Sequence, residues 1–265
     1  MYNCLILILV VGCSDFSESL KGDLLSSKDI TISDFNTDFP IVKLTVDQDE
    51  FDNMYSNFEE EIEIEGLFNL YRNNTLLISE ELVEIEVKGA SSALLELKSL
   101  GVKFDDAFNN EQGELLTPKK VLPNHSLKEI KAFRLRNSGS DFQETMIKDI
   151  SYTQLAIEAG LNIDLTYYEP SLVFVNDLFF GIMNLRSEAN ANGVSRLNET
   201  KKSNVTLAKI NGNGILEAND GDFDRIENFV KNIDDGDLEY LKKEIDIESF
   251  IDYLIFQSYI ANVDW

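Results

Sequence analysis

The sequence is poor in the residue types that most often carry catalysis or cross-linking. Its 265 residues include one histidine and two cysteines, and 23 basic residues stand against 48 acidic ones. A catalytic triad built on histidine would have to use His125, which lies just after Pro123 and is expected in a loop. The chain also lacks a nucleophilic serine elbow and a cluster of His and Cys. These absences exclude serine-elbow hydrolases and His/Cys metal centres.

The strong negative charge narrows the range of partners. A net charge of −25 repels phosphate backbones, which argues against duplex DNA or RNA as a partner. A bound nucleotide would need a metal ion or a local basic patch to offset this repulsion. Between Lys119 and Lys148 the balance reverses, with seven basic residues against three acidic ones. Taken alone this stretch is interpreted as a solvated basic face, and an anion-binding role depends on the motif that it contains.

The amino terminus is similar to an export signal. Residues 5–11 form a continuous apolar run that is too short to span a bilayer as a helix. The run leads into Val-Val-Gly-Cys13, which resembles a bacterial lipobox, although no Lys or Arg precedes it. We therefore predict a signal peptide with a lipobox over residues 1–13, lipidation of Cys13, and a polar tether over residues 14–38. The mature chain would be exported, free of thiols and anchored to the membrane of the bacterial cell envelope. A buried or disordered hydrophobic terminus is the alternative.

The chain after residue 38 shows strand and helix patterns in turn. Residues 40–46, 61–65 and 82–87 show period-two alternation, which predicts a β-rich first lobe over about residues 39–118. Further patterns predict a helix over residues 146–159, a hairpin joining residues 172–175 to 178–182, and an amphipathic helix over residues 247–255 with Asp246 as its N-cap.

Three stretches, in order, resemble one protein family. Residues 133–141 read Phe-Arg-Leu-Arg-Asn-Ser-Gly-Ser-Asp, residues 174–188 read Phe-Val-Asn-Asp-Leu-Phe-Phe-Gly-Ile-Met-Asn-Leu-Arg-Ser-Glu, and residues 261–265 read Ala-Asn-Val-Asp-Trp. A Lys-Gly-Ala-Ser-Ser turn at residues 88–92 and a lysine-bearing stretch at residues 98–104 precede them. The set resembles the spore-coat protein H (CotH-type) kinases from about Phe39 onward.

The resemblance implies a fold and an activity. The fold would be α+β, of the atypical protein-kinase-like type, with a β-rich amino-terminal lobe and a mixed helical second part, incomplete at the carboxyl terminus. The domain would span residues 39–265 and transfer phosphate from ATP, with Mg²⁺, to Ser or Thr hydroxyls of a protein substrate. The implied catalytic residue is Asp264, and the implied cofactor-binding residues are Lys98, Lys103, Arg134, Arg136 and Glu188. The metal ligands stay unassigned, because the family's metal-binding aspartate follows the Asp-Trp signature, so the chain as given is expected to be inactive.

Three positions depart from the family pattern. Lys148 stands where an arginine is usual, Asp177 where a glycine is usual, and Ser187 where a glutamate is usual. These departures fit an alternative, a non-catalytic surface lipoprotein that uses the fold for adhesion or scaffold assembly. A third hypothesis is a periplasmic carbohydrate- or peptide-binding module, which should show solvent-facing Tyr or Trp in a groove.

Overall fold

The computed structural model of the protein describes a large part of the chain. The described residues are 31, 32, 35, 37–89, 91–104, 121, 122, 130–188, 190–210, 216–234 and 238–262. The predictions for Cys13 and Asp264 lie outside them, as do three lysines of the basic stretch, Lys119, Lys120 and Lys128.

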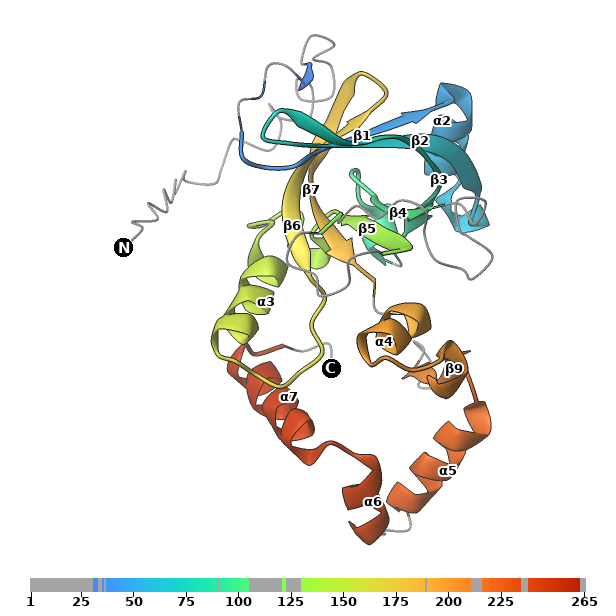
Figure 1. Ribbon diagram of the computed structural model, residues 1–265, viewed down its shortest axis with the longest axis vertical. Coiled ribbons are helices and arrows are strands. Elements are labelled where there is room, and N and C mark those ends of the chain that lie inside the picture. The colour runs from blue at the N-terminus through green and yellow to red at the C-terminus, as the bar shows by residue number, and fades with distance from the viewer. Residues whose placement is uncertain are drawn as a thin grey trace.

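Seven strands close into a barrel in the order β1-β2-β3-β4-β5-β7-β6 (Figure 1). Neighbouring strands are antiparallel, except that β1 runs parallel to β6 and so closes the barrel. Two further strands, β8 and β9, pair with each other in a small sheet. The strands are β1 Ile41–Val46, β2 Glu63–Arg72, β3 Thr75–Lys88, β4 Ser99–Phe104, β5 Ala132–Arg136, β6 Tyr168–Val175, β7 Leu178–Ser187, β8 Leu207–Ile210 and β9 Leu216–Asp220.

The helices lie against the barrel and in an arc beside it. In Figure 1, α3, α7, α6, α5 and α4 form this arc, whereas α2 lies on the barrel itself. Within the described part of the chain, no helix is both long and apolar enough to cross a bilayer. The α-helices are α2 Gln48–Ser56, α3 Lys148–Glu158, α4 Ala191–Leu197, α5 Phe223–Asp234, α6 Leu238–Glu244 and α7 Ile247–Tyr259; the 3₁₀ turns are η2 Phe58–Glu60, η3 Ser91–Leu94, η5 Gly139–Asp141 and η6 Lys202–Asn204.

The barrel interior is filled with apolar side chains. Along each strand successive residues point to opposite faces, so every second side chain enters the interior. Three phenylalanines, Phe68, Phe104 and Phe133, meet there with ring centroids 5.2 to 6.0 Å apart. Helix α2 adds Phe51 and Met54 to the same core. Full burial of one such side chain contributes about 1.5–3 kcal/mol relative to exposure, so the core accounts for a large share of the stability.

A second, smaller apolar cluster lies around Ile41, Leu172 and Phe174. Residues before the first strand pack onto it: the Phe35 ring lies 5.8 Å from the ring of Phe174, at 80° to it, and Ile32 packs against the same cluster. The last residues of the predicted tether therefore contact the barrel.

The predicted α+β, kinase-like fold with a separate β-rich lobe was wrong. Strands β5, β6 and β7, which come after residue 118, belong to the same closed barrel as the first four strands. The sequence patterns marked individual strands, but they carried no signal for the parallel pairing of Ile41 with Leu172 that closes the barrel. The individual elements were better predicted: the hairpin joins β6 to β7, and the Asp246 carboxylate caps α7 by accepting from the Ser249 amide.

A buried asparagine ties the turn after β3 to the barrel. Asn137 follows β5 and is fully buried. Its Nδ2 donates to the carbonyl oxygens of Leu97 at 2.6 Å and Ser92 at 3.3 Å, and its Oδ1 accepts from the Ser99 hydroxyl at 2.9 Å. Because these bonds join the turn to a fully buried side chain, the amide fixes the position of residues 92–97.

Replacing this amide should loosen that turn. We expect Asn137→Ala to lower the free energy of unfolding by about 2–3 kcal/mol, because several buried groups lose their only side-chain partner. Asn232→Ala is the matched control, since the Asn232 amide is exposed and donates only to the Asn228 carbonyl within α5. Chemical denaturation measures both, and equal stability of the two variants would contradict the assignment.

Candidate functional site

Three arginines gather on the outward-facing side of neighbouring barrel strands, where Arg186 is buried and the other two are half-buried. On β5, Phe133 and Leu135 enter the core, so Arg134 and Arg136 point outward. Arg134 lies directly opposite Arg186 of β7 in the register. We call the outer surface formed by Arg134, Arg136 and Arg186 the arginine face.

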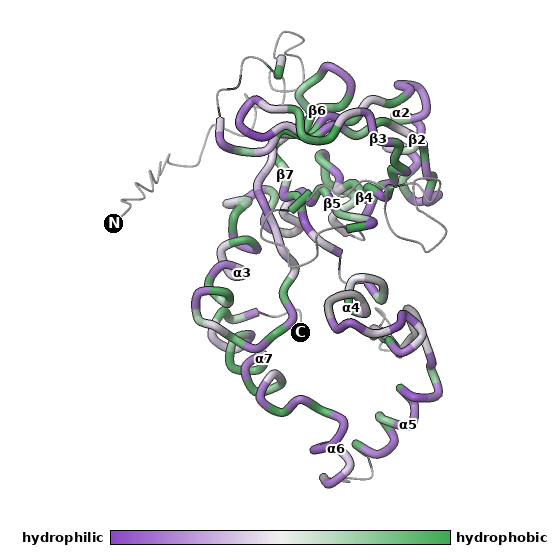
Figure 2. The backbone as a smooth tube through the Cα atoms, in the orientation of Figure 1, coloured by the Kyte–Doolittle hydropathy of each residue, from purple (hydrophilic) through white to green (hydrophobic). Residues whose placement is uncertain are grey.

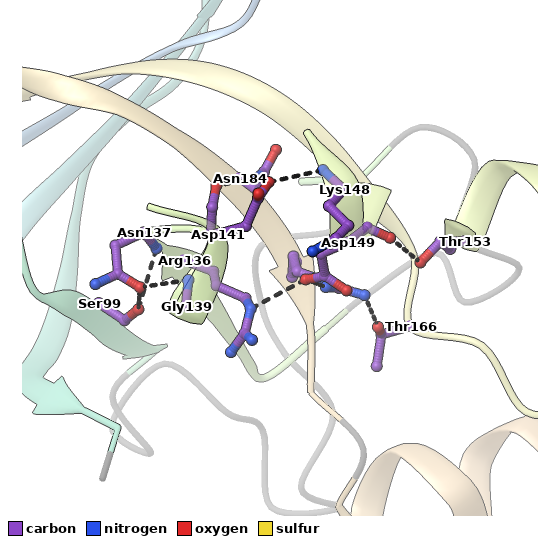
Figure 3. A network of polar contacts seen from close by, with 12 residues as sticks. Ser99, Arg136, Asn137, Gly139, Asp141, Lys148, Asp149, Thr153, Thr166 and Asn184 are labelled. Atoms are coloured by element: carbon purple, nitrogen blue, oxygen red, sulfur yellow. Dashed lines mark hydrogen bonds and ion pairs between the residues drawn. The ribbon is translucent and has the colours of Figure 1, made fainter. Parts of the chain in front are cut away.

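Two carboxylates hold the arginine face in place. Asp149, in the first turn of α3, accepts from Arg136 Nε at 3.0 Å and from Arg186, which also donates to the Thr166 hydroxyl (Figure 3). Glu188 lies 3.4 Å from a terminal nitrogen of Arg134. Three guanidinium groups therefore share two carboxylates among these contacts, which leaves a local excess of positive charge in a strongly acidic protein.

One nitrogen of the arginine face lacks a partner. Arg134 Nε is buried and donates no hydrogen bond to any of the described residues. A buried N–H of this kind costs roughly 1–3 kcal/mol unless a partner satisfies it. Like charges placed directly opposite each other on paired strands also destabilise a sheet. Arg134 thus combines two unfavourable features, and an anion bound beside it would relieve both by accepting from the N–H and by offsetting the charge.

A glycine keeps the surface beside Arg134 flat. Gly101 of β4 lies between Glu86 of β3 and Arg134 of β5 in the register. A Cβ atom added to Gly101 would lie 3.0 Å from two carbons of the Lys88 side chain, so Lys88 lies close over β4 at this glycine. Lys88 pairs with Glu86. The arginine face and the start of the Lys-Gly-Ala-Ser-Ser turn therefore lie on one continuous outer surface.

A cavity of about 530 Å³ opens beside this turn. Lys88, Gly89 and Ser91 line one side of it, and Glu59, Glu61 and Glu86 are also in its lining. Gly89 has a φ of +130°, and an added Cβ would clash with the Ser92 hydroxyl at 2.5 Å. The turn therefore requires glycine, and a polyphosphate bound here would meet carboxylates as well as one ammonium group.

The two predicted lysines lie in different environments. The Lys98 ammonium donates to the carbonyl oxygens of Ala93 at 2.6 Å and Leu95 at 3.1 Å, and it lies 4.5 Å from the centre of the Phe58 ring. Burial lowers the pKa of Lys98. Lys103 forms an ion pair with Glu84 on the outer surface of the barrel. Lys98 therefore holds the turn after β3, and its predicted contact with phosphate stays a prediction.

A buried aspartate positions the start of α3, and with it Asp149. Asp141 accepts from the Lys148 amide at 2.9 Å and from the Thr145 hydroxyl at 2.8 Å (Figure 3). Burial acts to raise the pKa of Asp141, but these hydrogen bonds outweigh it, so the pKa is lowered below its usual value. The backbone of Lys148 thus has a clear role, whereas its side chain forms an exposed contact with Glu144 at 3.7 Å.

Two members of this site were missed in the sequence. Arg186 and Asp149 were not among the predicted site residues, although Arg186 lies in a stretch that resembles the family, because nothing local predicts that Arg186 faces Arg134 across a strand pair. Of the Asn-x-Asp-Trp signature, the structure describes Asn262, whose amide Nδ2 donates to Gln257 Oε1 at 2.7 Å at the end of α7. Asp264 lies outside the described residues.

Removing the charge of Asp149 should destabilise the fold. Asp149→Asn would leave Arg136 and Arg186 without their shared carboxylate, and we expect the free energy of unfolding to fall by about 2–3 kcal/mol. Asp177→Asn is the matched control, because Asp177 is 92% exposed and its ion pair with Lys43 should contribute less than about 1 kcal/mol. Thermal unfolding of both variants would measure the difference, and a smaller effect at Asp149 than at Asp177 would contradict this account.

The contribution of Asp141 should depend on pH in a defined direction. Because its folded pKa is lowered, the stabilisation is fully present above the pKa of the unfolded chain and is lost as the pH falls through the folded value. We expect Asp141→Asn to be less stable than the parent protein by about 2 kcal/mol at pH 7, with the difference shrinking below about pH 4. Urea unfolding at several pH values measures it, and a difference that grows on acidification would refute the assignment.

Comparison with known proteins places this site in a family. No curated protein matches the chain. The profile of one family, described as CotH kinase protein, matches residues 85–265, a stretch that contains Arg134, Arg136, Asp149 and Arg186. This match covers more than half of the chain and confirms the resemblance recognised in the sequence motifs. The chain therefore belongs to the CotH kinase protein family.

Proposed function

We propose that the protein transfers the terminal phosphate of ATP, with Mg²⁺, to Ser or Thr hydroxyls of a protein substrate, and that the arginine face binds the phosphates. The observation that carries this proposal is the direct opposition of Arg134 and Arg186 across β5 and β7 within the stretch that matches the CotH kinase protein family. Phosphoryl transfer depends mainly on positioning and on neutralisation of charge, and planar guanidinium groups are well suited to phosphate oxygens.

The residues of the arginine face fit a nucleotide phosphate better than a second protein carboxylate. Arg134 has a buried Nε that none of the described residues satisfies, and a phosphate oxygen would accept from it. Asp149 already occupies Arg136 and Arg186, so it would fix their orientation while Arg134 contributes the unpaired donor. Glu188 would have to move aside from its 3.4 Å contact, or accept from another donor, when an anion binds.

The remaining roles fall to residues outside this face. In the proposed reaction Asp264 orients the acceptor hydroxyl and takes its proton, as the resemblance implies. Mg²⁺ would neutralise the phosphates. Among the described residues no group of three or more His, Cys, Asp or Glu side chains is arranged to hold a metal ion, so its ligands would include groups beyond them. Lipidation at Cys13 would hold the enzyme at the membrane of the cell envelope.

The acidic lining of the cavity beside the Lys-Gly-Ala-Ser-Ser turn favours the alternative function. Glu59, Glu61 and Glu86 would repel a polyphosphate that entered this cavity without a cation. If the arginine face serves only to hold the barrel and α3 together, the protein is a non-catalytic surface lipoprotein that uses its fold for adhesion or scaffold assembly.

Nucleotide binding separates the two functions. We expect ATP to bind in the presence of Mg²⁺, and we expect Arg134→Ala to raise the Kd at least about tenfold, since it removes the donor without a partner. Lys231→Ala is the control, because it removes the same charge from the exposed side of α5. Isothermal titration calorimetry measures both, and equal losses in the two variants would show a general charge effect.

The role of Asp264 needs a separate readout. Asp264→Asn should leave ATP binding within about twofold and abolish transfer of ³²P from ATP to a protein acceptor, because the carboxylate acts on the acceptor hydroxyl. Absence of ATP binding at millimolar concentration in the parent protein would overturn the kinase proposal and favour the adhesion or scaffold function.

A further inference from the structure

A second cavity, of about 430 Å³, lies among the carboxyl-terminal helices and shares no residue with the arginine face. Its lining comes from α4, the segment between α4 and β8, α5 and α6, and Figure 1 shows α4 and α5 across the helical arc from α3 and α7. We call it the helical pocket. Its volume falls within the range of roughly 300–1,000 Å³ that is typical of small-molecule sites. None of the motif residues that resemble the kinase family lies in it.

One wall of the helical pocket is aromatic. Phe229 of α5 and Tyr240 of α6 line it, with ring centroids 6.4 Å apart, and both side chains are half-buried. Ile226 of α5 and Val205 add aliphatic surface. An aromatic ring that lines a groove, as the half-buried Tyr240 does, is part of what the hypothesis of a carbohydrate-binding module requires.

Amide oxygens in the pocket are left as acceptors. Asn198 Nδ2 donates to the Val194 carbonyl oxygen at 2.9 Å, which fixes the amide orientation because only the nitrogen can donate. Asn204 Nδ2 donates to the Thr200 hydroxyl at 3.0 Å. In both residues the Oδ1 atom receives no hydrogen bond from the described part of the chain, so both can accept from a ligand hydroxyl.

Two side chains of opposite charge also line the pocket without forming an ion pair with each other. Arg225 of α5 and Glu244 of α6 line it, and neither forms an ion pair within the described ranges. The guanidinium group is a multiple donor and the carboxylate is an acceptor. The pocket therefore offers a donor, several acceptors and an aromatic surface at once.

This combination selects the chemistry of the ligand. A phosphate or carboxylate could accept from Arg225, but it would share the pocket with the Glu244 carboxylate, which repels it. An aliphatic ligand would leave Arg225 and the amides without partners and lose affinity. Vicinal hydroxyl groups both donate and accept, and the C–H face of a pyranose ring can lie on an aromatic side chain. We propose that the helical pocket binds a neutral saccharide of one or two rings, a function beyond the phosphotransfer proposed above.

Ligand-observed NMR tests this proposal. Saturation transfer from the protein would be measured to glucose, galactose, N-acetylglucosamine, cellobiose, lactose and chitobiose, with inorganic phosphate and citrate as anionic competitors. We expect at least one saccharide to receive saturation with millimolar affinity. Asn198→Ala and Arg225→Ala should each raise its Kd at least about tenfold, whereas Lys231→Ala, on the same helix as Arg225 but outside the lining, should leave it unchanged.

The outcomes separate this site from the nucleotide site. Failure of every saccharide to receive saturation would overturn the proposal, and so would displacement of a bound saccharide by phosphate or citrate, which would indicate an anion site. Unchanged binding in both pocket variants would place the saccharide elsewhere. Because Arg225 is exposed, its replacement should not shift the melting temperature, so loss of binding is separable from loss of fold. ATP affinity should be the same in all these variants.

Discussion

Closure of the barrel by the parallel pair of β1 and β6 is the constraint on which the rest of the structure depends. It pairs Ile41 with Leu172, which lie near opposite ends of the barrel sequence, and leaves each of the seven barrel strands with two partners. A closed barrel has no free edge to pair with another chain. It also divides the side chains of each strand strictly into an inner and an outer set, so that Phe133 and Leu135 must be core if Arg134 and Arg136 are to face outward.

Among the outward-facing side chains, like-charged arginines lie close together, and a carboxylate of α3 offsets part of their repulsion. Arg134 and Arg186 lie opposite each other because β5 pairs with β7. Arg136 lies two residues further along β5, on the same face. Asp149 relieves part of this repulsion, and Asp141 in turn fixes the helix start that brings Asp149 into position. In the polar network of Figure 3, the position of the arginine face therefore depends on Asp149, and the position of Asp149 depends on the buried Asp141 carboxylate. Stability and the proposed binding of phosphate use the same side chains.

Local features of this protein could be predicted from the sequence, whereas its architecture could not. The hairpin at Asn176-Asp177 and the cap at Asp246 depend on residues that are neighbours in the chain, and both were confirmed. The family was also recognisable, because Arg134 and Arg136 lie in a motif of fixed order. The barrel closure, the opposition of Arg134 and Arg186, and the helical pocket all depend on contacts between distant segments. Alternation of apolar and polar residues shows that a segment is a strand but not which strand it joins.

The acidic surface gives the two proposed sites different selectivity. With a net charge of −25, the protein repels free polyphosphates at long range, so an anion gains from binding only where guanidinium groups outnumber carboxylates, as on the arginine face. A neutral saccharide carries no such penalty and can enter the helical pocket, where Arg225 and Glu244 balance each other. The negative electrostatic potential of the protein also favours the approach of basic segments of an acceptor protein. It follows that salt should strengthen binding of ATP in the absence of Mg²⁺, weaken capture of a basic acceptor, and leave saccharide binding unchanged.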